Sequence, residues 1–274
     1  QIYRHMDIGT AKPTQEERRQ VPHHMLDVVE PWEPYSVAAY RDAAESCASA
    51  IFARGHIPVF CGGTGFYLRA LRHPMAMGGT AASAEVRSRL EKEAREEGGA
   101  EKLHERLTTL DPVTGSRLHV HDVHRVIRAL EVQEVTGIPF SCQPKLEDAV
   151  PTYDYRVVCL NRDRGRLYDR IERRVDSMVE RGLADEVEKL ISMGVSPSCQ
   201  SMQAIGYKEM LPYIRQECSL EEAKDLLKRN TRHYAKRQLT WMRREEDVLW
   251  LDADMEAEEL QQKALAYLEG MEVS

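Results

Sequence analysis

The sequence predicts an α/β protein whose core is interrupted by an all-helical insertion. The first observation is a helix at residues 37–54, then a short apolar strand at 57–61 and the glycine-rich turn 62–65. That order is typical of a parallel sheet covered by helices. The second is that helical patterns follow one another from residue 85 to 136 with no strand pattern between them. We therefore expect an α/β core, residues 1–76 and 151–274, and a helical insertion, residues 77–150.

Residues that cap helices mark the ends of several elements. Ser36 is a predicted N-cap of the first long helix, and Gly55 is its predicted left-handed C-cap. Asp111, which is followed by a proline, is the N-cap of a helix in the insertion. Ser219 begins a capping box that opens a long helix to about residue 244. The remaining predictions are helices 85–97, 100–110, 112–119, 122–136, 165–181, 183–193 and 255–270, and strands 155–160 and 248–251.

Composition and charge restrict the class of protein. The 274 residues carry a formal net charge of -7, with 42% hydrophobic and 30% charged residues, values close to an ordinary globular protein. No uncharged run approaches the ~20 residues that span a bilayer. The six cysteines are scattered without a C-x-x-C pair, which indicates free thiols in a reducing compartment. We expect a cytoplasmic monomer with no membrane segment and no metal ligands of its own.

The long helix after Ser219 carries the clearest charge signal. Residues 228–244 contain seven Lys or Arg and no acid, although the protein is acidic overall. Helical periodicity places Arg229, Arg232, Lys236 and Arg243 along one side. A solvated face normally mixes signs, and like charges repel unless an anion lies opposite. This helix therefore favours a polyanion-binding surface over a solvated face.

Three other features remain open on spacing alone. Arg170, Arg174 and Arg181 form a second basic face, but acids on the same helix could pair with them as well as a phosphate could. The turn 62–65 could let a ligand approach the backbone or be a plain structural turn. A basic cluster at a predicted helix start is explained better, on its own, by an exposed polar face than by phosphate binding; it consists of His121, His124, Arg125 and Arg128.

Seven stretches occur together in one order: residues 1–13 (QIYRHMDIGTAKP), 21–27 (VPHHMLD), 34–37 (PYSV), 62–67 (GGTGFY), 125–131 (RVIRALE), 203–209 (QAIGYKE) and 234–241 (YAKRQLTW). Together they resemble the signature motifs of the bacterial tRNA dimethylallyltransferases, the IPP transferase family. The resemblance covers the chain from residue 1 to about 252.

The resemblance implies a core like the P-loop nucleotide-binding folds and an insertion that binds the tRNA anticodon stem-loop. The implied reaction moves a dimethylallyl group from dimethylallyl diphosphate to the exocyclic amine of adenosine 37, beside the anticodon. Mg²⁺ would neutralise the departing diphosphate. The target adenine would be flipped out of the loop to reach the enzyme.

The resemblance also implies roles for individual residues. Thr64 and Arg174 would act at the catalytic centre, Thr64 near the target adenosine and Arg174, with Arg170, at the donor diphosphate. The implied tRNA contacts are Gln1, Thr64, Arg87, His124, Arg125, Arg128, Gln203, Gly206, Tyr207, Lys208, Lys236, Arg237, Gln238, Thr240, Trp241 and Arg243.

The family pattern includes two motifs that this sequence does not contain in full. One is a phosphate-binding loop, G-P-T-x-x-G-K-[ST]. The other is an Asp-Ser-x-Gln-x-Tyr motif whose Asp is the expected general base, and the chain begins at its Gln. The loop, the base and the first strand would precede Gln1. We therefore expect a truncated chain that is catalytically inactive by itself and has an unpaired sheet edge.

Three alternatives stand beside this interpretation. An adenylate isopentenyltransferase shares the chemistry but alkylates a free nucleotide, which requires neither the helical insertion nor the basic helix. A non-catalytic RNA-binding relative would be compatible with the absent phosphate-binding loop. A P-loop kinase of small metabolites would consume ATP and show no affinity for RNA.

Overall fold

The computed structural model describes residues 1–72, 83–143 and 153–270. The chain divides into two compact units. We call residues 1–71 with 154–274 the core unit and residues 72–153 the inserted unit. The boundaries expected after residues 76 and 150 lie outside the described residues.

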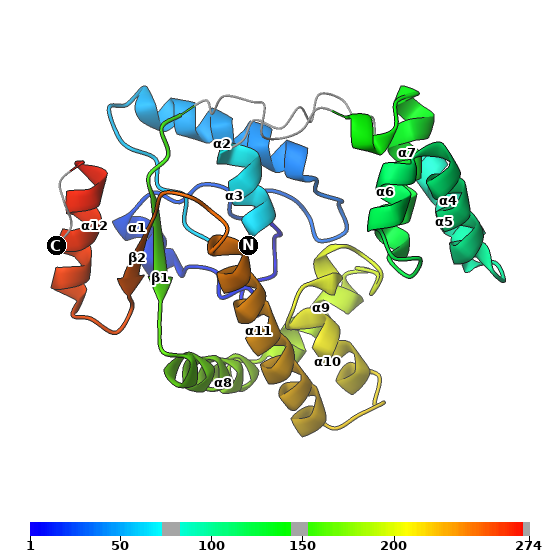
Figure 1. The fold of residues 1–274 in the computed structure, drawn as a ribbon. Coiled ribbons are helices and arrows are strands. Elements are labelled where there is room, and N and C mark those ends of the chain that lie inside the picture. The colour runs from blue at the N-terminus through cyan, green and yellow to red at the C-terminus, as the bar shows by residue number, and fades with distance from the viewer. Residues whose placement is uncertain (73–82, 144–152, 271–274) are drawn as a thin grey trace. The chain divides into compact units, whose positions relative to one another are not determined.

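The described sheet consists of two parallel strands (Figure 1). Strand β1, Val157–Asn161, pairs with β2, Val248–Asp252, in a register that aligns Val157 with Val248. Both strands were predicted. The strand predicted at residues 57–61 is wrong, because this segment forms no strand and Ile57 and Val59 are 79% and 83% exposed. An extended run becomes a strand only beside a hydrogen-bonding neighbour, and no described strand lies beside this one.

Most helices of the core unit begin and end close to the predicted residues. Ser36 Oγ accepts from the Ala39 amide, and Ser219 and Glu222 form the predicted capping box. The helices are α1 Gln15–Gln20, α2 Val37–Phe52, α3 Gly65–Arg72, α8 Arg164–Glu180, α9 Leu183–Ser192, α10 Tyr207–Ile214, α11 Leu220–Met242 and α12 Ala257–Leu268, with a 3-10 turn, η3, at Ser201–Gln203.

Helices α8 to α11 surround the hydrophobic core of the core unit (Figure 1). Val175 of α8, Val187 of α9, Met210 of α10 and Leu227 of α11 are all buried there. Met6, in the N-terminal segment, is also fully buried in this cluster. The segment that carries the first motif is thereby fixed to α10 and α11, which carry most of the motifs at residues 203–209 and 234–241.

The inserted unit has a separate core and contains only helices among its described elements. These are α4 Ala84–Arg95, α5 Gly99–Leu110, α6 Pro112–Arg117, α7 Val123–Thr136 and the 3-10 turn η1 Phe140–Cys142. Leu90, Leu107 and Leu130 are fully buried between α4, α5 and α7. Asp111 is the predicted N-cap of α6 and accepts from the Thr114 amide at 3.0 Å. No described helix of either unit combines the length and apolar character needed to cross a membrane.

Candidate nucleic-acid interface

The glycine turn lies against the C-terminal end of α11, which is beside α3 in Figure 1. Gln238 Nε2 donates to the Gly63 carbonyl at 3.0 Å. A Cβ on Gly65 would lie 2.5 Å from the Trp241 ring, so only glycine permits this approach. Thr64, between these glycines, is exposed, and its carbonyl accepts from the Tyr67 amide at the start of α3.

The same end of α11 presents cations to solvent. Lys236, Arg237, Thr240 and Arg243 are exposed, whereas Gln238 and Trp241 are partly buried against the turn. Within the described parts of the chain, Lys236 and Arg243 have no ion-pair partner. Two residues expected as tRNA contacts thus support the turn, and four others form an exposed surface beside it.

We call the Lys and Arg side chains of residues 228–244 the basic stripe; at its N-terminal end, two of them pair with acids of α8. Lys228 Nζ lies 2.8 Å from Asp176 Oδ1, and Arg232 Nη1 lies 2.7 Å from Glu172 Oε1. The hydrogen bond from Lys228 lowers the pKa of Asp176 below its usual value. The anion that the stripe requires is therefore supplied in part by the protein itself, and Arg232 is not the free cation that the periodicity suggested.

These contacts also decide the open question about α8. Its acids Glu172 and Asp176 face α11 and pair with the cations there. Arg170 and Arg174 are exposed and form no ion pair with any described residue. Both guanidinium groups remain available for a phosphate, whose oxygens they match in pairs.

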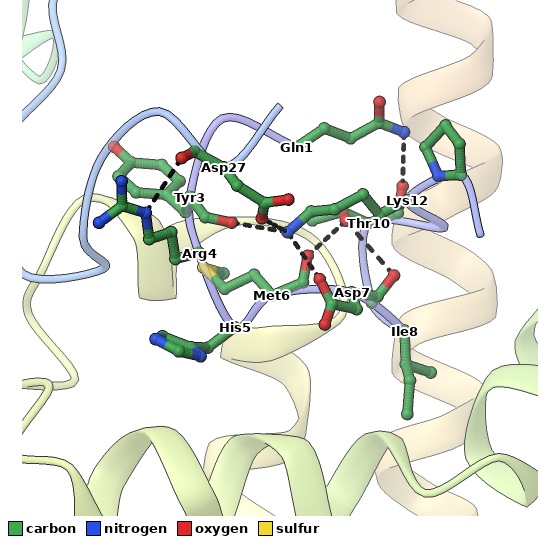
Figure 2. Close-up of polar contacts among 12 residues, drawn as sticks. Gln1, Tyr3, Arg4, His5, Met6, Asp7, Ile8, Thr10, Lys12 and Asp27 are labelled. Atoms are coloured by element: carbon green, nitrogen blue, oxygen red, sulfur yellow. Dashed lines mark hydrogen bonds and ion pairs between the residues drawn. The ribbon is translucent and has the colours of Figure 1, made fainter. Parts of the chain in front are cut away.

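A buried lysine organises the N-terminal segment, as Figure 2 shows. Lys12 Nζ donates to the Tyr3 carbonyl at 2.8 Å and to carboxylate oxygens of Asp7 and Asp27 at 2.7 Å each. The Lys12 side chain is 1% exposed. Burial raises the pKa of Asp27, but hydrogen bonds from Lys12 and Arg18 lower it by more, so the carboxylate stays charged. The sequence analysis did not single out Lys12.

Gln1 also acts inside this segment. Its Nε2 donates to the Thr10 carbonyl at 3.1 Å, and the residue is exposed (Figure 2). This bond joins the two ends of the first motif. The expected tRNA contact by Gln1 would therefore come from a side chain whose position is already fixed within the motif.

Glu186 of α9 joins the first motif to the motif at residues 203–209. Its carboxylate accepts from the amides of Asp7 at 2.9 Å, Ile8 at 2.8 Å and Gly9 at 3.1 Å. A Cβ on Gly9 would lie 2.6 Å from the Tyr207 ring. Tyr207, expected as a tRNA contact, is instead fully buried, so it supports the loop from inside.

The other residues of the motif at 203–209 lie partly on the surface and partly in the interior. Gln203 and Lys208 are exposed. Gly206 is buried, with a φ of 105° that favours glycine, and its amide donates to Glu209 Oε2 at 2.7 Å. Gly206 therefore shapes the turn into α10, and contact with RNA at this motif is left to Gln203 and Lys208.

The inserted unit places its four candidate residues on α4 and α7. Arg87 and Arg128 both donate to one carboxylate oxygen of Glu131, at 2.7 and 2.8 Å. His124 and Arg125 are exposed near the start of α7, and Arg125 lies 3.1 Å from Asp122.

The described residues contain no candidate metal centre. No group of three or more His, Cys, Asp or Glu side chains among them could hold a metal ion. Mg²⁺ therefore remains an expectation from the resemblance.

The fold and this surface define a class: an α/β protein with a helical insertion and a cationic helix that ends on a glycine turn. The chain belongs to the IPP transferase family, whose model matches residues 1–245. It is 47% identical over 260 residues to a tRNA dimethylallyltransferase from Pelotomaculum thermopropionicum, which covers 93% of this chain and 82% of the relative.

Solved structures agree with the assignment to this family. The crystal structure of a tRNA isopentenylpyrophosphate transferase from Bacillus halodurans matches with a TM-score of 0.71 and 42% identity, over 98% of this chain and 84% of that one. A eukaryotic dimethylallyltransferase acting on tRNA matches with a TM-score of 0.81 and 26% identity, over all of this chain and 72% of that one. The predicted family and fold class are confirmed. The predicted truncation and inactivity find no support in these comparisons and stay predictions.

Proposed function

We propose that this protein is a tRNA dimethylallyltransferase that modifies the N6 amine of adenosine 37, next to the anticodon. The products would be N6-isopentenyladenosine in the tRNA and free diphosphate. The observation that carries the proposal is the glycine turn with Thr64, held by Gln238 and Trp241 beside the exposed cations of α11. The names of the relatives support it.

In the proposed reaction the N6 amine attacks the allylic carbon of dimethylallyl diphosphate. A carbon–nitrogen bond forms, the carbon–oxygen bond to the diphosphate breaks with its electron pair, and the amine loses one proton. Arg170 and Arg174 are suited to the diphosphate because guanidinium groups bind phosphate oxygens in pairs and keep their charge. Thr64 would lie beside the acceptor amine, where its exposed position leaves the hydroxyl accessible.

The proposed acceptor is an unpaired loop rather than a duplex. Loop bases are recognised by stacking and by contacts to the sugar-phosphate backbone. On the core unit, the exposed candidates for those contacts are Gln203, Lys208, Lys236, Arg237, Thr240 and Arg243. On the inserted unit they are the exposed Arg87, His124 and Arg125, with the partly exposed Arg128. One copy of the chain carries all of these groups, so we propose a monomeric enzyme.

The test is incubation with dimethylallyl diphosphate, Mg²⁺ and unmodified tRNA, followed by mass spectrometry of the nucleosides. Two polypeptides are compared: the 274 residues and a version with the phosphate-binding loop and the Asp-containing motif placed before Gln1. We expect the mass increase of one dimethylallyl group at adenosine 37 with the longer version. Transfer by the shorter version would contradict the predicted inactivity.

The same assay separates the alternative functions. No transfer by the longer version, despite tight tRNA binding, would indicate a non-catalytic RNA-binding relative. Transfer to AMP in place of tRNA would indicate an adenylate isopentenyltransferase. Consumption of ATP without RNA affinity would indicate a small-metabolite kinase.

A further inference from the structure

We propose that Glu131 is a positioning residue for tRNA binding, which holds Arg87 and Arg128 in one fixed arrangement on the inserted unit. The inference rests on the proposed function, because it concerns how two of the candidate tRNA contacts are presented. Glu131 was not among the residues that the sequence analysis assigned to tRNA binding.

The geometry joins two helices through one oxygen atom. Glu131, on α7, has a fully buried side chain, and its Oε2 accepts from Arg87 Nη2 at 2.7 Å and from Arg128 Nη1 at 2.8 Å. Arg128 lies one helical turn earlier on α7, whereas Arg87 comes from α4. The side chains of Arg87 and Arg128 remain 45% and 35% exposed. Each guanidinium keeps further N–H donors beyond its bond to Glu131.

The charge balance leaves a net positive site. Burial raises the pKa of Glu131, but the hydrogen bonds and charges of Arg87 and Arg128 lower it by more. The carboxylate is therefore ionised at neutral pH and offsets one of the two guanidinium charges. One positive charge remains, at a surface where two donor groups face a potential phosphate.

The arrangement is poorly explained as a stabilising device alone. Glu131 Oε1 is buried and has no hydrogen-bond partner among the described residues. Part of the free energy needed to remove this carboxylate from water is therefore not recovered by hydrogen bonding. Buried ion pairs can often be replaced by apolar residues of similar volume without loss of stability. A bridge that orders two arginines before binding instead reduces the side-chain entropy lost when they contact phosphate.

Positioning and simple charge make opposite predictions for Glu131→Gln. This substitution keeps the shape and removes a negative charge, so charge alone predicts tighter binding of the tRNA polyanion. Positioning predicts weaker binding, because a neutral amide no longer holds two mutually repelling cations together. Glu134→Gln is the matched control: Glu134 is on the same helix and pairs with Arg89 and Arg106, which are not candidate contacts.

The experiment measures the Kd for unmodified tRNA over a range of salt concentrations, using the full chain and each variant. We expect Glu131→Gln to weaken binding about 10-fold and to lower the slope of log K against log salt by about one to two, because each lost phosphate contact contributes roughly one. Glu134→Gln should bind with an unchanged slope and equal or slightly tighter affinity. Thermal melting of both variants shows whether the fold is kept.

If Glu131→Gln does not fold, Arg87→Lys replaces it. Lysine keeps the charge but lacks the planar fork that reaches carboxylate and phosphate together, so positioning predicts weaker binding here as well. A folded Glu131→Gln or Arg87→Lys protein that binds as tightly as the unmodified protein, with the same slope, would overturn the inference alone. An unmodified protein with no affinity for tRNA would overturn the inference and the proposed function together.

Discussion

The Tyr207 hydroxyl donates a 2.6 Å hydrogen bond to Glu186 Oε1. The same carboxylate receives the backbone amides of residues 7–9, so two family motifs that lie far apart in the sequence are anchored on one side chain. Burial, and then the charge of Glu186, raise the pKa of Tyr207. The phenol therefore remains a hydrogen-bond donor at every physiological pH.

Tyr207→Phe should remove this bond and leave Glu186 with one donor fewer. We expect a loss of about 1–2 kcal/mol in the free energy of unfolding, because a partly buried carboxylate acceptor loses one of its donors. Urea denaturation measures it. Tyr213→Phe, on the same helix and only partly buried, is the control and should change stability by less than half as much. Equal effects of the two substitutions would contradict the anchoring role of Tyr207.

Lys12→Met should destabilise the N-terminal segment strongly. The substitution keeps the apolar stem but removes the ammonium that binds Tyr3, Asp7 and Asp27. Breaking a buried pair by removing one partner costs about 3–5 kcal/mol, to be measured by urea denaturation. Lys189→Met, at an exposed lysine of α9, should be nearly neutral. A neutral effect of Lys12→Met would show that the two aspartates find other partners.

The stability contributed by Asp111 should depend on pH. Burial raises its pKa, but hydrogen bonds from Thr114 and Ser141 lower it by more, from 3.8 to about 2. Because the folded-state pKa is the lower one, the contribution is complete above the unfolded-state pKa and is lost as pH falls toward 2. The free energy of unfolding of the unmodified protein should exceed that of Asp111→Asn by about 2 kcal/mol at pH 6. This difference should shrink as the pH falls from about 5 to about 2. A difference that stays constant would contradict this account.

Lys236→Ala and Lys228→Ala should affect different properties. Lys236 is exposed without an ion-pair partner among the described residues, so its loss should reduce the salt slope of tRNA binding by about one and leave stability unchanged. Lys228 is paired with Asp176, so its loss should lower stability and change the slope less. Filter binding and thermal melting of the two variants make the comparison. Identical salt slopes for the two variants would show that pairing with α8 does not distinguish Lys228 from Lys236 in tRNA binding.

Gly65→Ala should disturb the glycine turn, whereas Gly62→Ala should not. A methyl group at Gly65 would overlap the Trp241 ring, while one at Gly62 meets nothing within 4 Å. We expect Gly65→Ala to cost about 1–3 kcal/mol through overpacking and to weaken tRNA binding. Urea denaturation and the affinity for tRNA are the measurements. Equal stability and equal tRNA affinity of the two variants would mean that α11 can move away from residue 65 without loss of stability.

The sequence predicted those parts of the fold that depend on local signals. The capping residues Ser36, Asp111 and Ser219 act within a few positions of themselves, and all three lie where expected. The segment 57–61 has the apolar character of a strand, but pairing depends on a neighbour that its own residues do not specify.

The candidate site was predictable only in part for the same reason. Whether Arg232 is free or paired depends on α8 packing against α11, which periodicity along one helix does not reveal. Glu131 did leave a signal, because an acid among the buried positions Val126, Ile127 and Leu130 of an amphipathic helix indicates a buried ion pair. Its partner Arg87 lies on another helix, beyond what spacing can identify.

The two hydrophobic cores share no residue among those described. An exchange of residues 72–153 for the corresponding segment of a relative would therefore replace one described hydrophobic core as a whole and leave the residues of the other unchanged. If the inserted unit binds the tRNA as proposed, chimaeras made this way would take acceptor preference from one parent and prenyl transfer from the other. On the proposed assignment of tRNA contacts to the inserted unit, natural substitutions in its core would alter RNA recognition while the residues of the other core stay the same.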